Sequence, residues 1–133
     1  MIDAKLNNKK IDTSTIKNYL VSGQTGIDGI CFLLANNIYG VNIANPSMDW
    51  FFTYRNNNGE VRSVSLIPSY EESLVKLPWI PDSDATKIAG RMEIQLTGEI
   101  VNQETKLIAM RWVSELAVIY VMENVSPEPI IGL

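Results

Sequence analysis

The chain of 133 residues contains no histidine and only one cysteine, Cys31. Without histidine, the Ser-His-Asp and Cys-His catalytic arrangements and the commonest general base of enzymes are excluded. A single cysteine cannot form an intrachain disulfide or a multi-cysteine zinc site. Because Cys31 lies in the apolar run 30–34, we expect a buried side chain rather than a reactive thiol. The sequence therefore predicts a protein that is not an enzyme and has no cofactor and no metal site.

Clustered positive charge and long apolar runs are also missing. Eleven basic and fifteen acidic residues give a net charge of −4. Nucleic-acid binding depends on clustered basic residues that release counterions, so we expect no nucleic-acid partner. No apolar stretch approaches the ~20 residues of a membrane-spanning helix, and the polar N-terminus lacks the apolar core of a signal peptide. We therefore expect folding in a reducing cytoplasm and no membrane partner.

Two other kinds of catalytic site receive little support from the residues. Ser-x-x-Lys occurs at residues 14–17, but the β-branched flanks predict a strand there. Glu71 and Glu72 are adjacent, so in an extended segment their side chains point to opposite faces. Asp82 and Asp84 fit the cap of a turn better than the alternative, a calcium site.

Short apolar segments separated by turn residues predict an all-β fold. We expect strands at residues 11–16, 30–34, 48–54, 60–67, 73–79, 91–97, 106–113 and 116–122. Asn58-Gly59 is the clearest hairpin signal, and 91–97 has the cleanest alternation, with Met92, Ile94 and Leu96 facing inward. About seven strands in ~100 residues favour an immunoglobulin-like antiparallel β-sandwich.

The same pattern divides the chain into three parts. Residues 1–10 are polar and are predicted to form a flexible N-terminal arm. Residues 11–124 are predicted to form the sandwich. Residues 125–133 contain two prolines and are predicted to form an extended C-terminal tail.

The three tryptophans could support stacking against a sugar, and only one is predicted to be accessible. Trp50 and Trp112 are in phase with apolar neighbours on their strands, which indicates core packing. Trp79 lies between Pro78 and Pro81 at a strand end, where a ring can be partly exposed. One function that the sequence allows is therefore a carbohydrate- or cell-surface-binding module. Trp79 is its candidate ligand contact.

The segment 116–122 is apolar on both faces, unlike the strand at 91–97. One face of a sandwich strand packs on the core, so the other must be covered by this chain or by another chain. The segment 126–133 that follows is apolar and interrupted by prolines, which suits a contact with a neighbour. We predict a contact with another copy of the chain or with a partner protein through five apolar residues: Ile119, Val121, Ile130, Ile131 and Leu133.

Two stretches of the sequence resemble a group of phage proteins. The first comprises residues 11–17 and 21–30. The second begins with Leu-Pro-Trp-Ile-Pro at 77–81 and continues through the alanine-containing corner 84–90 into the strand 91–96. The two stretches, in this order along the chain, resemble the N-terminal immunoglobulin-like domain of phage head-fibre and baseplate-upper proteins.

This resemblance implies a structural role in a phage particle. It implies a location in the virion, assembly with other virion proteins of the capsid or baseplate, self-association, and no catalytic residues. Many relatives continue into a fibre or receptor-binding region, whereas this sequence ends at Leu133. The resemblance therefore favours a head fibre, a capsid decoration protein, or a baseplate or tail adaptor over a receptor-binding protein.

Overall fold

The computed structural model describes residues 1–125, and regular structure in this part of the chain is nearly all β. One short helix, α1, spans Ser83–Thr86. The strands are β1 (Ile2–Asn7), β2 (Lys10–Ile11), β3 (Ile30–Ala35), β4 (Asn37–Ile38), β5 (Val41–Asn42), β6 (Asp49–Arg55), β7 (Val61–Leu66), β8 (Ser69–Tyr70), β9 (Leu74–Trp79), β10 (Gly90–Val101), β11 (Ile108–Val113) and β12 (Ala117–Val121). No helix of the described residues is long and apolar enough to cross a membrane.

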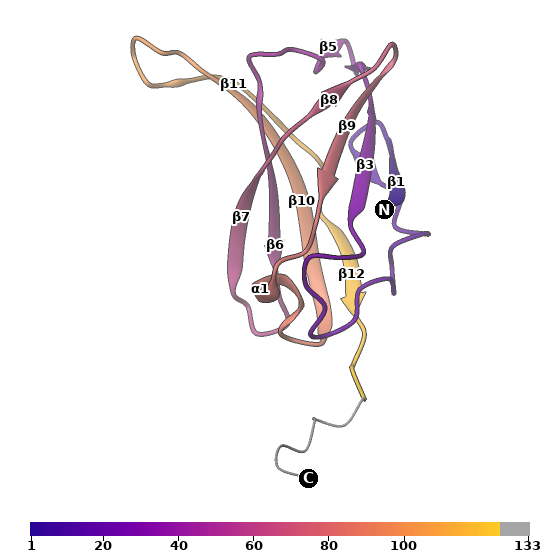
Figure 1. The fold of residues 1–133 in the computed structure, drawn as a ribbon. Helices are drawn as coiled ribbons and strands as arrows, with labels where there is room; N and C mark the ends of the chain where they lie inside the picture. The colour runs from indigo at the N-terminus through magenta and orange to yellow at the C-terminus, as the bar shows by residue number, and fades with distance from the viewer. Residues whose placement is uncertain (126–133) are drawn as a thin grey trace.

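Two sheets pack face to face around one core (Figure 1). One sheet has the order β2-β1-β3-β9-β8 and the other β11-β10-β6-β7. Strand β12 pairs with the first part of β10, and β11 pairs with its last part. The predicted all-β sandwich is confirmed. The immunoglobulin-like subtype stays a prediction. Two pairings depart from the predicted antiparallel arrangement, because β1 runs parallel to β3 and an isolated parallel bridge joins Val21 to Met122.

Alternation along the strands determines which side chains form the core. Met92, Ile94 and Leu96 of β10 are fully buried, as their period of two predicts. Each buried side chain of this size stabilises the fold by about 1.5–3 kcal/mol relative to an exposed one. The core is therefore the main source of stability for this domain.

Aromatic rings connect the two sheets. The ring of Phe52 on β6 lies 5.5 Å from Phe32 on β3 and 4.1 Å from Trp79 on β9, measured between centroids. Trp50 and Trp112 are buried and meet edge to face at 5.7 Å. The predicted core packing of Trp50 and Trp112 is confirmed.

The turns predicted from Asn, Gly and Asp are present. Gly59 has φ +81° in the β6–β7 connection, a conformation that β-branched residues resist. The side chain of Asn56 closes the same loop by accepting hydrogen bonds from the backbone N–H groups of Asn58 and Glu60, each at 3.0 Å. Asp82 caps α1 by accepting a hydrogen bond from the Ala85 N–H at 2.9 Å.

The N-terminal residues belong to the sandwich, so the prediction of a flexible arm at 1–10 is wrong. Strand β1 pairs with β3 and places Ile2 beside Ile30. Ala4 is buried, and Ile2 and Leu6 pack against the core. Ile2, Ala4 and Leu6 alternate with polar residues, and this period of two is that of a strand with one face on the core. The high polar content of 1–10 made the pattern difficult to detect in the sequence.

Residues 12–19 form turns, so the predicted strand at 11–16 is also wrong beyond Ile11. The Asp12 carboxylate accepts a hydrogen bond from the Ser14 N–H at 3.0 Å, and the Lys17 N–H donates to the Thr13 carbonyl at 2.8 Å. Such local hydrogen bonds override the strand preference of β-branched residues. Ser14 and Lys17 both lie exposed on this turn.

Candidate interaction surfaces

The carboxylates and the thiol considered in the sequence as candidates for metal binding or catalysis were located in the structure. No group of three or more His, Cys, Asp or Glu side chains in residues 1–125 could hold a metal ion. Asp82 caps α1, and Asp84 forms ion pairs with Arg62 at 3.1 Å and Lys87 at 3.7 Å. Cys31 is buried, and burial raises the pKa of its thiol, which keeps it protonated.

Trp79 is almost fully buried, so the prediction of a partly exposed ring that serves as a contact is wrong. The residue is only 3% exposed, and its ring stacks on Phe52. Trp79 follows Val75 and Leu77 on the inward face of β9, and this phase outweighs the flanking prolines. Pro78 lies beyond the point where β8 stops pairing with β9, so its missing N–H leaves no gap in the ladder.

The predicted assembly contact is only partly within the described residues. Ile119 and Val121 are buried in the core of their own chain, so their prediction as contact residues is wrong. The segment has two apolar faces, and the sequence did not indicate which one faces inward. Ile130, Ile131 and Leu133 lie outside the described residues.

The outward face of β12 carries the accessible apolar residues. Leu116, Tyr120 and Met122 are exposed there. The free edge of β12 is covered by this chain, because the Tyr120 N–H donates to the Lys17 carbonyl at 2.8 Å and the Met122 N–H donates to the Leu20 carbonyl at 2.7 Å. The segment 17–22 therefore protects this edge while leaving the outward side chains open.

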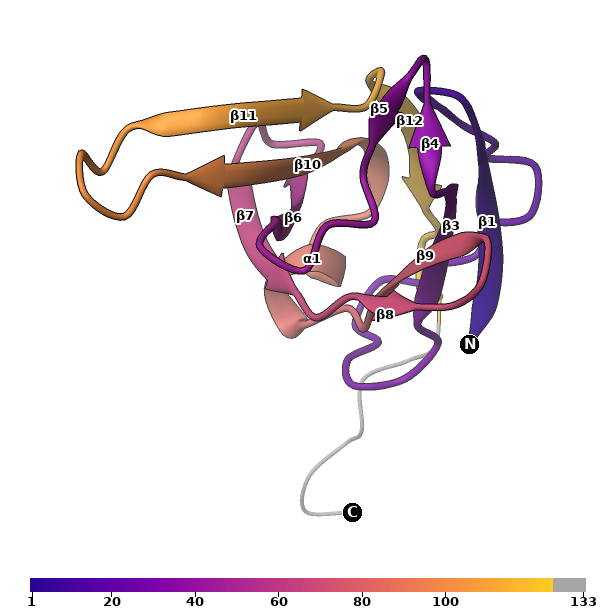
Figure 2. The same cartoon turned by 90° about the horizontal axis from the view of Figure 1, so that it is seen from above.

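The β10–β11 hairpin extends beyond the rest of the sandwich (Figure 2). Strand β6 accompanies β10 only as far as the pair Asp49–Glu99, so from Ile100 onward β10 has only β11 beside it. We call residues 100–110 the arm. Near its tip Leu107 is 69% exposed and Ile108 is 44% exposed.

Hydrogen bonds hold the tip of the arm in one conformation. The Asn102 side chain accepts hydrogen bonds from the backbone N–H groups of Glu104 and Thr105, at 2.9 and 3.1 Å. The Asn102 N–H donates to the Leu107 carbonyl, and the Lys106 N–H donates to the Asn102 carbonyl, each at 2.8 Å. The arm therefore presents its exposed apolar residues on an ordered support.

Strand β11 has a free edge among the described strands. The Ser114 N–H donates to the Leu96 carbonyl at 2.9 Å, which sets the phase of the β10–β11 ladder. Because hydrogen-bonded pairs alternate in an antiparallel ladder, the backbone groups of Arg111 and Val113 point away from β10. The Glu115 N–H shares this phase and donates to the Lys9 carbonyl at 2.8 Å. Arg111 and Val113 thus offer open pairing positions at the edge.

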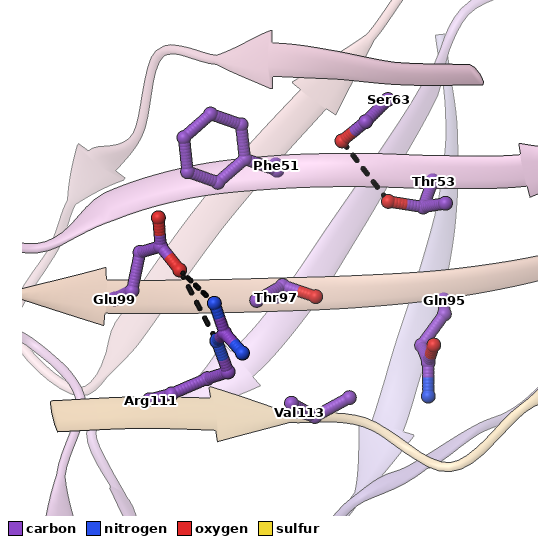
Figure 3. Close-up of a pocket in the computed structure, with 8 residues that line it drawn as sticks. All are labelled: Phe51, Thr53, Ser63, Gln95, Thr97, Glu99, Arg111 and Val113. Atoms are coloured by element: carbon purple, nitrogen blue, oxygen red, sulfur yellow. Dashed lines mark hydrogen bonds and ion pairs between the residues drawn. The ribbon is translucent and has the colours of Figure 1, made fainter. Parts of the chain in front are cut away.

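A hollow of about 420 Å³ opens on the outer face of the sheet β11-β10-β6-β7 (Figure 3). Thr97 lies at its centre, with Phe51 on the neighbouring β6 and Val113 on β11. At one end Arg111 donates two hydrogen bonds, from Nε at 3.2 Å and Nη2 at 3.1 Å, to one carboxylate oxygen of Glu99. The hollow thus combines an aromatic ring, a hydroxyl and an internally neutralised charge pair.

Polar side chains line the other end of the hollow (Figure 3). The Thr53 hydroxyl donates to the Ser63 hydroxyl at 3.0 Å. The Gln95 amide N–H donates to the Ser114 carbonyl at 2.9 Å, which fixes the orientation of its side chain. This site was not predicted from the sequence; the available signal was Phe51, an aromatic residue that shares its phase in the strand with the polar residues Asp49 and Thr53.

Comparison with known proteins adds a relationship at the level of the fold. No family model and no curated protein matches the chain. Seven solved chains do match. One is the N-terminal domain of phage TP901-1 ORF48, with a TM-score of 0.51 and 12% sequence identity, over 92% of this chain and 97% of that chain. This chain has the fold of that phage domain. At 12% identity, the likeness extends to the fold alone.

Proposed function

We propose that the protein is a structural component of a phage virion that acts by binding other virion proteins. The observation that carries the proposal is the arm, an ordered projection with exposed Leu107 and Ile108 and an unpaired edge on β11. The shared fold with a phage domain supports the same conclusion.

Apolar side chains near the tip of the arm are exposed to solvent in the free chain. Burying apolar surface contributes roughly 25 cal/mol per Å², and much of the surface of Leu107 and Ile108 remains exposed in the described part of the chain. An ordered arm loses little conformational entropy when a partner binds it. A partner strand added to β11 would bond with the outward groups of Arg111 and Val113, while its side chains cover the exposed tip.

The finer parts of the proposal concern place and partners. The protein serves as a head fibre, a capsid decoration protein, or a baseplate or tail adaptor, and it is located in the virion. It self-associates, and the outward face of β12, with Leu116, Tyr120 and Met122, forms a second contact. Ile130, Ile131 and Leu133 follow β12 in the sequence and belong to this second contact.

Purified phage particles containing variant chains test the proposal. Arg111→Pro removes an outward N–H from β11, a change that an edge strand tolerates, and should prevent incorporation. Arg111→Ala keeps that N–H while removing the same side chain, so it should incorporate normally. Mass spectrometry of the particles measures both.

Three results would contradict the proposal. The first is the absence of the wild-type chain from purified particles, which would remove the virion role. The second is normal incorporation of Arg111→Pro, which would remove strand addition at β11. The third is equal loss with Arg111→Ala and Arg111→Pro, because that result would assign the effect to the side chain.

A further inference from the structure

We propose that the hollow on the outer face of the sheet β11-β10-β6-β7 binds a neutral sugar. This inference goes beyond the virion role and rests on different residues from the arm tip. It replaces Trp79, which is buried, with Phe51 as the aromatic contact. The volume of about 420 Å³ is in the range of small-ligand sites.

The shape of the hollow follows from the side chains of neighbouring strands. Thr97 is short, so the middle of the sheet face is low, and Phe51 and Val113 stand beside it on the flanking strands (Figure 3). Gln95 and Glu99 precede and follow Thr97 on the same face of β10, and they close the two ends. The result is a trough whose long axis runs along β10.

The apolar and polar parts of the trough match the two kinds of surface on a sugar ring. One face of a pyranose presents C–H groups, which pack against the flat ring of an aromatic side chain. The half-buried ring of Phe51 offers such a surface. The rim of a pyranose presents hydroxyls, each of which both donates and accepts. Thr97, Gln95 and Glu99 supply polar atoms around the same space.

The charges lining the trough favour a neutral ligand over an anion. Arg111 is the one basic residue in the lining, and both of its bonding nitrogens contact the same oxygen of Glu99. The guanidinium charge is therefore already matched, and a phosphate would have to compete with the carboxylate for it. A neutral hydroxyl can instead bond to Glu99 Oε1 without disturbing the pair.

Titrations of the full chain followed by NMR test the proposal. The probes are glucose, galactose, N-acetylglucosamine, rhamnose, and the β-linked disaccharides of glucose and of N-acetylglucosamine. At least one should produce saturable shifts centred on Thr97, Phe51 and Val113. Phe51→Ala should weaken that binding roughly tenfold or more, a loss of about 1.4 kcal/mol or greater.

Two further variants separate loss of the site from loss of the fold. Thr97→Arg places a long side chain in the floor of the trough, on an outward position, and should abolish binding while the denaturation midpoint stays close to that of the wild type. Val61→Ala is the matched control, because Val61 is an exposed apolar residue on the same sheet but outside the lining. It should leave binding unchanged.

The outcomes that would overturn the proposal are specific. They are the absence of saturable binding by every sugar in the panel, shifts centred away from Thr97, and unchanged affinity in Phe51→Ala or Thr97→Arg. Tighter binding of glycerol phosphate than of any neutral sugar would overturn the charge argument. Protection of Thr97 and Phe51 by another virion protein, without sugar binding, would make the face a protein interface instead.

Discussion

The β10–β11 hairpin differs between its base and its tip, although both contain apolar residues. At the base, Leu96 and Trp112 are buried between the two sheets. At the tip, Leu107 and Ile108 are exposed, because Leu107 precedes β11 and Ile108 pairs with Val101 on the outward face of β10. An apolar residue in a predicted strand is therefore not necessarily covered, because its face depends on the register with the neighbouring strand.

This difference gives the two ends of the hairpin different roles. The base contributes stability, because its apolar side chains lie in the core. The tip contributes little to stability and remains available for a partner. Variants at the two ends should therefore separate stability from assembly.

The largest effect is expected at Ile94, which is fully buried in β10. Ile94→Ala removes buried methyl groups and leaves a cavity, so it should cost about 2–5 kcal/mol of the free energy of unfolding. Denaturant-induced unfolding measures this loss. An unchanged midpoint would contradict the inward register of β10.

A smaller loss is expected at Gly98, where the base of the hairpin meets the core. A Cβ atom at this position would lie 2.6 Å from the Met48 sulfur and 2.9 Å from the Trp50 ring. Gly98→Val should therefore cost about 1–3 kcal/mol through overpacking, measured by the same unfolding experiment. Val101→Ile, on the outward face of the same strand, is the control and should have little effect. A Gly98→Val chain as stable as the wild type would show that the base is loosely packed.

High pH should weaken the core without acting on the tip. Burial, and after it the charge of Asp82, raises the pKa of Tyr54 to about 12. An unfolded tyrosine ionises near pH 10, so the stability should fall as the pH rises from about 10 toward about 12. Tyr54→Phe should make this decline shallower, as measured by denaturation midpoints across that range. Tyr39→Phe, which removes an exposed hydroxyl, is the control. A decline of equal steepness in the Tyr54→Phe chain would exclude Tyr54 as its source.

The smallest effect on stability is expected at the tip. Ile108→Glu changes an exposed side chain, so the free energy of unfolding should change by less than about 0.5 kcal/mol. Incorporation into particles should nevertheless be lost, because the charge would be buried at the contact. Ile27→Glu changes an exposed isoleucine in the loop before β3 and should incorporate normally. Normal incorporation of Ile108→Glu would show that the tip makes no contact.

Much of the fold could be predicted where one face of a strand is polar. In β10, polar residues alternate with Ile94 and its neighbours, so the inward face was unambiguous. In β12 both faces are apolar, and the sequence did not indicate that Ile119 faces inward and Tyr120 outward. That choice depends on the pairing with β10, which places Met92 beside Ile119. A long-range register of this kind has no local signal.

The candidate sites were harder to predict than the fold. Trp79 was predicted to be accessible because prolines flank it. Its alternation with Leu77 is the signal that indicates the inward face of the strand. Phe51 shares the outward phase of Asp49 and Thr53, yet its value as a contact depends on Thr97 and Arg111 from other strands. The exposure of Ile108 depends on the register shift in the β10–β11 ladder, which pairs it with Val101 on the outward face. Each of these features requires the relative positions of strands that are distant in sequence.

Hydrogen exchange at the backbone amides of Arg111 and Val113 tests the assembly claim most directly. It should be compared between the free chain and the chain in purified particles. The outward phase of these amides predicts fast exchange in the free chain and strong protection in the particle, where a partner strand would bond to them. Equal exchange in the two states would contradict strand addition at β11 and the assembly role of the arm.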